Sequence, residues 1–284
     1  ELGIDHVALA RRADLILIAP ATANVLAKLA HGITDDVLTA TVLARSQPLV
    51  VAPAMDADMY ENPATQANVK TLISRGVHFI GPESGRLASG LVGNGRMTEV
   101  PEIIGHVRAI LGRSGDLADR QVVVSAGGTE EAIDPVRVLT NRSTGKMGYA
   151  IAEAARDRGA KVTLITAPTY LPIPVGVNLV AVGSAIEMQK AVRNACLESD
   201  LLVMAAAVSD YRPSDPSDNK IKKTGDDGLS IDLSQNPDII AGISGERLVK
   251  VAFAAETNDV IENADAKLLS KGVDMVVAND VSAA

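Results

Sequence analysis

Two groups of polar residues in the second half of the chain combine types and spacings that suit phosphate chemistry. Residues 141–148, with the sequence Asn-Arg-Ser-Thr-Gly-Lys-Met-Gly, lead into an expected helix. Hydroxyl groups and backbone N–H groups at the start of a helix form a natural anion site. Residues 220–223 contain three lysines and one isoleucine. Neighbouring ammonium groups can offset the charge of a polyphosphate or of a transferring acyl phosphate.

Both groups also have a structural alternative. The pair at 145–146 suggests a P-loop, but Thr140 stands where its first glycine should be and Met147 where a serine or threonine should follow. Ser143 and Thr144 are of the types that ordinarily cap helices, and a lysine-rich strand is an ordinary way to protect a sheet edge. The patterns alone leave ligand binding and simple packing both open.

Further candidate positions follow expected strands, where open α/β sheets bind their ligands. In the second half these are two glycines and a threonine at 127–129, Asp210, and the stretch 236–239. An acid at the carboxyl end of a strand points to a ribose, a base or a metal, whereas a cap and turn at a helix start is the plain alternative for 236–239. The G-x-G-x-x-G spacing is missing after the first strand, which disfavours a nicotinamide oxidoreductase.

The first half contains three stretches of the same kind. Residues 20–24 and 53–60 each follow an expected strand, and residues 85–97 form a glycine-rich loop in which we expect little regular structure. His6 precedes the first strand, and a single histidine is more often a surface or capping residue than a catalytic one. These positions suggest a second ligand site in a separate sheet.

All of these positions depend on a regular alternation of short apolar runs with longer amphipathic stretches. The β-branched runs predict strands at 15–19, 49–52, 77–80, 122–125, 162–166, 201–204, 249–253 and 275–278. Apolar spacings of three and four residues predict helices at 23–30, 35–44, 63–75, 102–111, 146–158, 185–197 and 260–271. Such alternation indicates βαβ units with parallel strands. One segment departs from it, because residues 220–223 and 229–233 predict an antiparallel hairpin around a turn at 225–228.

The composition narrows the class of protein. With 284 residues, 47% of them hydrophobic and 2% aromatic, the chain is long enough for two domains with aliphatic cores. A formal net charge of -8 does not favour general electrostatic binding of nucleic acid or of an anionic membrane. No apolar run is long enough to span a bilayer. The single cysteine, Cys196, favours a reducing cytoplasm.

A polar break at 112–116 predicts a domain boundary. We therefore predict an α/β protein of two Rossmann-like domains with open parallel sheets: residues 1–112, a linker at 113–118, and residues 119–284 with an added antiparallel hairpin. The chain begins with Glu1, just before an apparent helix, and ends just after a strand. We expect it to be a piece of a longer protein, truncated at both ends.

Stretches of the second half, in their order along the chain, resemble phosphopantothenate–cysteine ligase, a module of the bifunctional coenzyme A biosynthesis flavoprotein family. They lie at 127–137, 141–148, 205–213, 220–223, 236–239, 253–257 and 278–281. The resemblance implies that CTP converts the carboxylate of 4'-phosphopantothenate into an acyl-cytidylate and that the amine of cysteine then displaces CMP. The mixed anhydride supplies the leaving group that a carboxylate lacks, and the protein positions the reactants and offsets phosphate charge.

The resemblance also implies roles for single residues. Lys220 neutralises the reacting phosphate, Asn141 holds the acyl-cytidylate, and Arg137 assists at the phosphopantothenate side. A divalent cation, normally Mg²⁺, accompanies the triphosphate, and its protein ligands are not assigned. The positions that match nucleotide contacts in the family are Met204, Ala205, Ala206, Asp210, Pro237, Asp238, Ile239, Ile240, Phe253, Lys267 and Lys271.

The first half resembles phosphopantothenoylcysteine decarboxylase, an FMN enzyme of the homo-oligomeric cysteine-decarboxylase flavoprotein family and the other module of the same bifunctional proteins. His6, in the stretch Asp-His-Val-Ala-Leu-Ala, matches the catalytic histidine of that family. The resemblance implies oxidation of the cysteinyl thiol end to a thioaldehyde, loss of carbon dioxide, and return of the resulting enethiolate to 4'-phosphopantetheine. The residues that it assigns to FMN are Pro20, Ala21, Thr22, Asn24 and Met55, and it adds Asp56 and Ser89 to the catalytic set.

Two positions depart from the decarboxylase pattern. Asp56 stands where the family has asparagine, and an ionised carboxylate would repel the substrate carboxylate to which an amide can donate. Ser89 stands where the family has a cysteine that protonates the enethiolate, and serine is a far weaker acid. Because the family's N-terminal phosphate-binding segment is also missing, we expect this chain to bind FMN weakly or not at all. A yellow sample with stoichiometric flavin absorbance would contradict that expectation.

Together these features predict a cytoplasmic, homo-oligomeric enzyme of coenzyme A biosynthesis whose first domain is of flavoprotein type. Its partners are 4'-phosphopantothenate, cysteine and CTP, with no nucleic acid and no membrane. The resemblance implies a dimeric ligase module and a trimer-based decarboxylase module. The alternative is a non-catalytic Rossmann-like protein that only binds a nucleotide. Arg137, Asn141, Asp210 and Lys220 argue against it, because packing alone does not require such a polar set.

Overall fold

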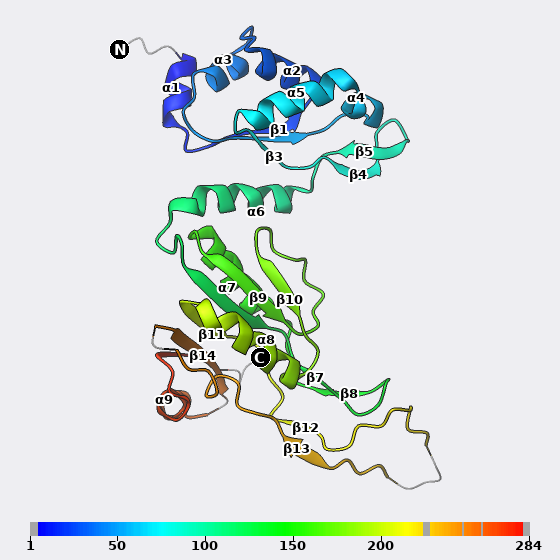
Figure 1. Ribbon diagram of the computed structural model, residues 1–284, viewed down its shortest axis with the longest axis vertical. Coiled ribbons are helices and arrows are strands. Elements are labelled where there is room, and N and C mark those ends of the chain that lie inside the picture. Colours follow the sequence, from blue (N-terminus) through cyan, green and yellow to red (C-terminus); the bar gives the residue numbers. More distant parts are fainter. Residues whose placement is uncertain (1–4, 224–227, 246, 257, 281–284) are drawn as a thin grey trace. The chain divides into compact units, whose positions relative to one another are not determined.

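The computed structural model describes residues 5–223, 228–245, 247–256 and 258–280 (Figure 1). The chain divides into two units, Glu1–Leu111 and Gly112–Ala284, and each is described by itself. Both are α/β units with a parallel sheet, as the alternation of apolar runs and amphipathic stretches predicted. None of the described helices is long and apolar enough to cross a membrane.

The first unit has a parallel sheet whose central strand is buried on both faces. Its strands are β1 (Ile16–Ala21), β2 (Leu49–Pro53) and β3 (His78–Phe79), in that order. On one face of β2, Val51 packs with Leu26 and Leu72, and on the other face Val50 packs with Ile103. The helices that supply these contacts and their neighbours are α1 (Asp5–Arg12), α2 (Ala23–His31), α3 (Val37–Leu43), α4 (Ala57–Glu61), α5 (Pro63–Ser74) and α6 (Val100–Leu111).

The glycine-rich stretch at 85–97 has regular structure, so the prediction of an irregular loop is wrong. β4 (Glu83–Arg86) and β5 (Val92–Arg96) form an antiparallel hairpin there. Its glycines allow close packing on the segment after β2, because a Cβ on Gly95 would lie only 2.2 Å from the carbonyl oxygen of Met55. Glycine has a low propensity for strands, so the local sequence pattern does not predict strands here. The contact with the segment after β2 is a tertiary one, which that pattern does not contain.

The second unit is built on a parallel sheet whose described strands have the order β10-β9-β6-β11-β14-β15. The chain runs from β6 outward to β9 and β10 and then returns to β11 on the other side of β6. This reversal is the topological switch point at which open α/β sheets bind ligands. The strands are β6 (Gln121–Ala126), β9 (Lys161–Thr166), β10 (Asn178–Ala181), β11 (Leu201–Met204), β14 (Val249–Glu256) and β15 (Met275–Asp280), and the helices are α7 (Lys146–Asp157), α8 (Ala185–Ala195) and α9 (Val260–Lys271), with short 3-10 turns at Gly112–Ser114 and Cys196–Glu198.

Two antiparallel strand pairs lie outside this sheet. β7 (Glu130–Ala132) pairs with β8 (Val138–Thr140), β12 (Tyr211–Pro213) pairs with β13 (Leu233–Gln235), and β12 lies beside β7 (Figure 1). The added antiparallel hairpin is therefore present, and its strands are β12 and β13. The predicted positions of these strands are wrong, because residues 220–223 and 228–232 are not part of any strand. Most of the predicted turn lies outside the described residues. Strands of three residues are too short to show an alternating pattern, which is why both pairs escaped prediction.

Cys196 lies in the apolar core of the second unit and is 8% exposed. Burial raises the pKa of its thiol to about 11. Since the thiolate is the reactive form of cysteine, we expect the folded protein at mildly alkaline pH to react slowly with an aromatic disulfide reagent, and the unfolded protein to react fast. The absorbance of the released thiolate, followed with and without guanidinium, measures both rates. Equal rates would show that the thiol is open to solvent.

Candidate functional site

The carboxyl ends of β6 and β11 are joined by backbone hydrogen bonds at the switch point. The N–H of Ala207 donates to the carbonyl of Gly127 over 2.8 Å, and the N–H of Thr129 donates to the carbonyl of Ala207 over 3.2 Å. The glycines at 127 and 128 were expected to let a ligand approach the backbone. The chain itself uses this space, because a Cβ on Gly128 would lie 2.6 Å from the carbonyl oxygen of Asn141. The small residues thus draw the loop that begins at Asn141 against the switch point.

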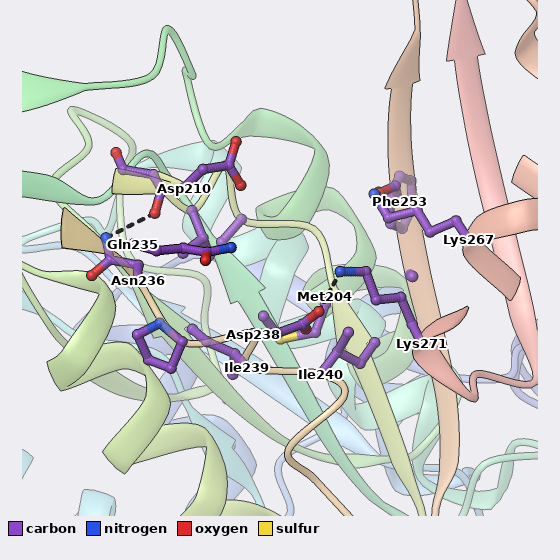
Figure 2. A pocket seen from close by; sticks show the side chains of 15 residues that line it. Met204, Asp210, Gln235, Asn236, Asp238, Ile239, Ile240, Phe253, Lys267 and Lys271 are labelled. Atoms are coloured by element: carbon purple, nitrogen blue, oxygen red, sulfur yellow. Dashed lines mark hydrogen bonds and ion pairs between the residues drawn. The ribbon is translucent and has the colours of Figure 1, made fainter. Parts of the chain in front are cut away.

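A first cavity, of about 230 Å³, is lined by residues from β11, β14, α9 and the segment after β13 (Figure 2). All of the residues predicted to contact the nucleotide line it except Ala205. Its wall also contains Asn236, from the candidate stretch 236–239, and Val208, Ser209, Gln235 and Ala252, which were not among the predicted site residues. Each of these is within two positions of a predicted one, so a wider window around Asp210, Pro237 and Phe253 would have included them.

Two lysines of α9 belong to the wall of the first cavity. Lys271 forms an ion pair with Asp238, and the Nζ of Lys267 donates to the carbonyl oxygen of Phe253 over 2.7 Å (Figure 2). Burial by itself raises the pKa of the Asp238 carboxyl, but hydrogen bonds from Lys271 and from the Ala241 N–H, with the charges of both lysines, bring that pKa below its ordinary value. Aliphatic walls, two ammonium groups and carboxylates together suit a base and ribose with attached phosphates.

A second cavity, of about 520 Å³, is lined by residues 140–144 and by residues 168–171. The helix α7 begins beside it, preceded by Gly145 in a left-handed conformation with φ of 72°. The hydroxyl of Ser143 accepts from the N–H of Gly145 over 3.3 Å, one position short of the helix. Among the described residues, no side chain caps the first turn of α7 at its N-cap position. The hydroxyl of Thr144, however, accepts from the N–H of Lys146, the first residue of α7, over 3.5 Å. The helix-cap alternative therefore also accounts for part of this stretch.

Asn141 connects the two cavities. It lies in the wall of the second cavity, and its Nδ2 donates over 3.1 Å to the carbonyl oxygen of Val208, which lines the first. Because a carbonyl oxygen only accepts, this contact fixes which end of the amide faces Val208. The second N–H and the oxygen of the amide are the groups with which Asn141 could hold a molecule that extends from one cavity into the other.

Lys220 and Arg137 are not in the lining of either cavity. Lys220 is exposed. The guanidinium of Arg137 donates through Nε to the carboxylate of Asp134 over 2.9 Å and through Nη2 to the carbonyl oxygen of Ile221 over 2.7 Å. Arg137 thus binds the segment that carries Lys220. The described residues contain no group of three or more histidine, cysteine, aspartate or glutamate side chains that could hold a metal ion.

In the first unit, most of the predicted residues lie at the carboxyl ends of β1 and β2. Of the residues assigned to a flavin, Pro20 and Ala21 end β1, the hydroxyl of Thr22 caps α2, Asn24 is exposed in the first turn of α2, and Met55 is half-buried after β2. Hydroxyl, amide and thioether groups at the carboxyl edge of a parallel sheet have the chemistry to contact a flavin ring system.

The catalytic candidates of the first unit come from three different elements. The Asp56 carboxylate caps α4 by accepting from the Asp58 N–H over 3.3 Å. The N–H of Met55, next in the chain, donates over 3.0 Å to the carbonyl of Gly95 in β5. This bond ties the Asp56 segment to the hairpin whose turn carries the exposed Ser89. His6 lies half-buried in the first turn of α1, which packs against α3.

Comparison with known proteins covers both units. Residues 2–112 match the family described as flavoprotein, and residues 117–284 match the DNA/pantothenate metabolism flavoprotein C-terminal domain. The coenzyme A biosynthesis bifunctional protein CoaBC of Vibrio cholerae is 46% identical over 100% of this chain, which spans 72% of that protein. The CoaBC protein of Bacillus subtilis is 45% identical over 99% of this chain and 70% of its own length.

Solved structures support the predicted α/β fold. A crystal structure of the C-terminal domain of a CoaBC protein is 41% identical, with a TM-score of 0.51, over 58% of this chain and 79% of that one. The DNA/pantothenate metabolism flavoprotein from Streptococcus pneumoniae is 25% identical, with a TM-score of 0.51, over 57% of this chain and 82% of that one. From this fold and from sequence identity along its whole length, the chain belongs to the family of CoaBC bifunctional proteins of coenzyme A biosynthesis.

Proposed function

We propose that this chain is an enzyme of coenzyme A biosynthesis with two activities. Its second unit joins 4'-phosphopantothenate to cysteine with CTP, and its first unit decarboxylates the product to 4'-phosphopantetheine with FMN. Membership of the CoaBC family supports both steps. The single observation that carries the ligase assignment is the bond from Asn141 to Val208, which links two cavities at the switch point of the sheet.

The ligase reaction uses the two cavities for two substrates. CTP occupies the first cavity and 4'-phosphopantothenate the second, so that the substrate carboxylate meets the α-phosphorus of CTP near Asn141. A carboxylate oxygen of 4'-phosphopantothenate bonds to the α-phosphorus while the bond between that phosphorus and the leaving pyrophosphate breaks. The amine of cysteine then attacks the acyl carbon and loses a proton, and CMP leaves with the electron pair. Placing the reactants and offsetting phosphate charge are the main contributions of the protein.

Cationic side chains supply that charge compensation. Lys267 and Lys271 lie in the wall of the nucleotide cavity. Lys220, which is exposed and lies outside both cavity walls, would reach the reacting phosphate with its long side chain. A divalent cation such as Mg²⁺ would enter with the triphosphate oxygens, which are its preferred kind of ligand. The lysines offset the charge that remains on the leaving pyrophosphate.

The first unit is assigned the decarboxylation. Pro20, Ala21, Thr22, Asn24 and Met55 would contact the FMN, whose binding to this chain we expect to be weak, and when bound it supplies the electron acceptor and donor that the substrate requires. Of the remaining residues, His6 exchanges a proton with the substrate, and Asp56 and Ser89 act at its carboxyl and thiol ends. Domain limits of 1–112 and 119–284, a homo-oligomeric assembly and a cytoplasmic location belong to the same proposal.

The test of the ligase assignment is pyrophosphate release from CTP by the full chain. We expect release only when 4'-phosphopantothenate is present, and CMP with the amide product only after cysteine is added. ATP in place of CTP is the control for the nucleotide, and faster release with ATP would replace CTP in the proposal. Tight binding of CTP without any release would instead favour a non-catalytic nucleotide-binding protein.

Lys271→Gln is expected to raise the KM for CTP about 10-fold, with little effect on kcat. The change leaves the Asp238 carboxylate without its partner beside the triphosphate, and the two repel each other. In the unaltered chain burial raises the pKa of Asp238 and Lys271 gives the largest opposing effect, so the variant moves this pKa up from its lowered value toward the ordinary carboxyl value of about 4. The carboxylate is ionised above that range, and the repulsion is lost as the pH falls through it. The raised KM should therefore persist across the neutral range. Steady-state kinetics over a CTP series measures it.

A double variant separates charge repulsion from loss of shape. Adding Asp238→Asn to Lys271→Gln removes the unpaired carboxylate and should restore most of the affinity. Lys161→Gln, which changes an exposed lysine at the opposite end of the sheet, is the matched control. An unchanged KM in the single variant would remove the ion pair from CTP binding.

A further inference from the structure

We propose that Asp134 is a positioning residue for the ligase reaction, which together with Arg137 clamps the backbone of Ile221 and so holds Lys220 near the reacting phosphate. This role rests on the proposed function of the second unit. Asp134 is a buried carboxylate outside the lining of both cavities, and the sequence patterns assign it no task.

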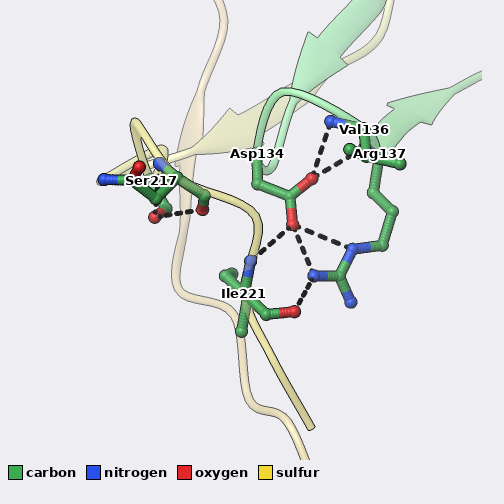
Figure 3. A network of polar contacts seen from close by, with 6 residues as sticks. Asp134, Val136, Arg137, Ser217 and Ile221 are labelled. Atoms are coloured by element: carbon green, nitrogen blue, oxygen red, sulfur yellow. Dashed lines mark hydrogen bonds and ion pairs between the residues drawn. The ribbon is translucent and has the colours of Figure 1, made fainter.

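The two carboxylate oxygens of Asp134 accept hydrogen bonds from different partners. Asp134 lies in the turn between β7 and β8 and is 2% exposed. Its Oδ1 accepts from the N–H groups of Val136 and Arg137, over 2.8 and 2.9 Å. Its Oδ2 accepts from Nε and Nη2 of the Arg137 side chain and, over 3.1 Å, from the N–H of Ile221 (Figure 3). One oxygen shapes the turn, and the other reaches a segment far along the chain.

Arg137 completes the clamp. Its Nη2 bonds to Asp134 and also donates to the carbonyl oxygen of Ile221 over 2.7 Å (Figure 3). Both peptide groups of Ile221 are therefore bound by one pair of side chains, much as a neighbouring strand would bind them. Residues 220–223 form no ladder of their own, so these side chains take the place of a strand partner. The side chains of Lys220 and Lys222, on either side of the clamped residue, are exposed.

The clamped turn also leads to Asn141. β8 ends at Thr140, so Asn141 follows it directly. A further backbone bond, from the N–H of Ser217 to the carbonyl of Ile133 over 3.0 Å, fastens the segment before Lys220 to the same turn. Lys220 and Asn141 are both proposed to act on the acyl-cytidylate. A common anchor fixes their separation, and a misplacement of about 1 Å at such positions can cost about 100-fold in rate.

A purely structural role would confine Asp134 to its own turn, and Asp134→Asn separates the two roles. The amide oxygen can still accept from the N–H groups of Val136 and Arg137. The amide NH₂, however, meets the N–H donors of the Arg137 side chain and of Ile221, and donors do not bond to donors. The variant therefore opens the clamp while the turn keeps its caps. In the unaltered chain the hydrogen bond from Arg137 holds the pKa of Asp134 below its ordinary value, so the clamp is charged at neutral pH.

The experiment compares variants of the full chain by kinetics and by proteolysis. For Asp134→Asn we expect kcat for pyrophosphate release to fall about 100-fold while the KM for CTP stays within about twofold. Tryptic cleavage after Lys220 and its neighbours, without substrates, should become about 10-fold faster because the segment is released. Asp218→Asn removes the same charge from an exposed position in the same segment and should behave as the unaltered chain. Unchanged kcat and unchanged cleavage in Asp134→Asn would overturn the proposal.

A second variant covers the case in which Asp134→Asn does not fold. Arg137→Lys keeps a cation beside Asp134 but lacks the fork that also reaches Ile221, so kcat should fall without a matching change in KM. An unchanged kcat there would equally overturn the positioning role. Failure of the proposed function is distinguishable, because it appears as no pyrophosphate release by the unaltered chain. The cleavage comparison needs no substrate, and equal cleavage of variant and unaltered chain rejects the clamp itself.

Discussion

Replacing Lys220 by alanine should slow acyl-cytidylate formation by about 100- to 1000-fold while the chain keeps its fold. The Lys220 side chain is exposed, so its removal leaves no cavity in a core. What is lost is a positive charge beside the phosphate from which pyrophosphate departs, where negative charge grows in the transition state. Pyrophosphate release without cysteine, together with mass spectrometry of the acyl-cytidylate, measures this half-reaction directly.

Two further variants make the Lys220 result specific. Lys190→Ala removes an exposed lysine from α8, away from both cavities, and should leave the rate unchanged. Lys220→Arg keeps the charge with a different geometry and should retain part of the activity, because a point charge tolerates replacement better than a bidentate contact does. Turnover of Lys220→Ala within about twofold of the unaltered chain would remove Lys220 from the mechanism.

Asn141→Asp should lower the overall rate of amide formation by about 100-fold. In the structure, Nδ2 of Asn141 donates to the carbonyl oxygen of Val208. A carboxylate of the same size would bring two acceptor oxygens together and would add a negative charge close to the triphosphate. The loop that begins at Asn141 should therefore move away from the first cavity, and the acyl-cytidylate should no longer be held in place.

Measuring the two half-reactions separately locates the damage. Pyrophosphate release without cysteine reports the first, and CMP release after cysteine is added reports the second. Asn194→Asp places the same new charge on an exposed position of α8 and serves as the matched control. If both half-reactions of Asn141→Asp stay within about twofold, the link between the two cavities has no catalytic role.

Most residues that line the nucleotide cavity could be predicted from local sequence patterns together with the family resemblance. Its wall is assembled from β11, β14, α9 and the segment that follows β13, and each contributes residues with a pattern of its own. Asp210 follows a predicted strand, Pro237 and Asp238 form a turn, and Lys267 lies on a predicted helix. Once the strands are parallel, their carboxyl ends must lie at one edge of the sheet. The gathering of these residues was therefore predictable from types, order and family resemblance.

Arg137 shows where that reasoning stops. The resemblance predicts a role for it on the phosphopantothenate side of the site, which stays a prediction, and the structure adds that its guanidinium binds Asp134 and the backbone of Ile221. Asp134 and Ile221 are more than eighty positions apart along the chain, and no spacing rule connects a buried carboxylate to a peptide group at that separation. The same limit applies to one antiparallel pair, because the paired residues of β12 and β13 lie twenty or more positions apart in the chain.

The sequence by itself determined the two α/β units, the strands of their central sheets other than β10, the helices beside those sheets other than α4, and the residue types able to do phosphate and flavin chemistry. It could do so because helix and strand periodicity, caps and turn residues are local properties. Only the tertiary structure decided that Asn141 joins two cavities, that glycines 127 and 128 admit the chain's own backbone, and that Asp134 and Arg137 hold the lysine segment. These features are hydrogen bonds and close contacts between segments far apart in the chain, and their geometry exists only once the sheet has brought those segments together.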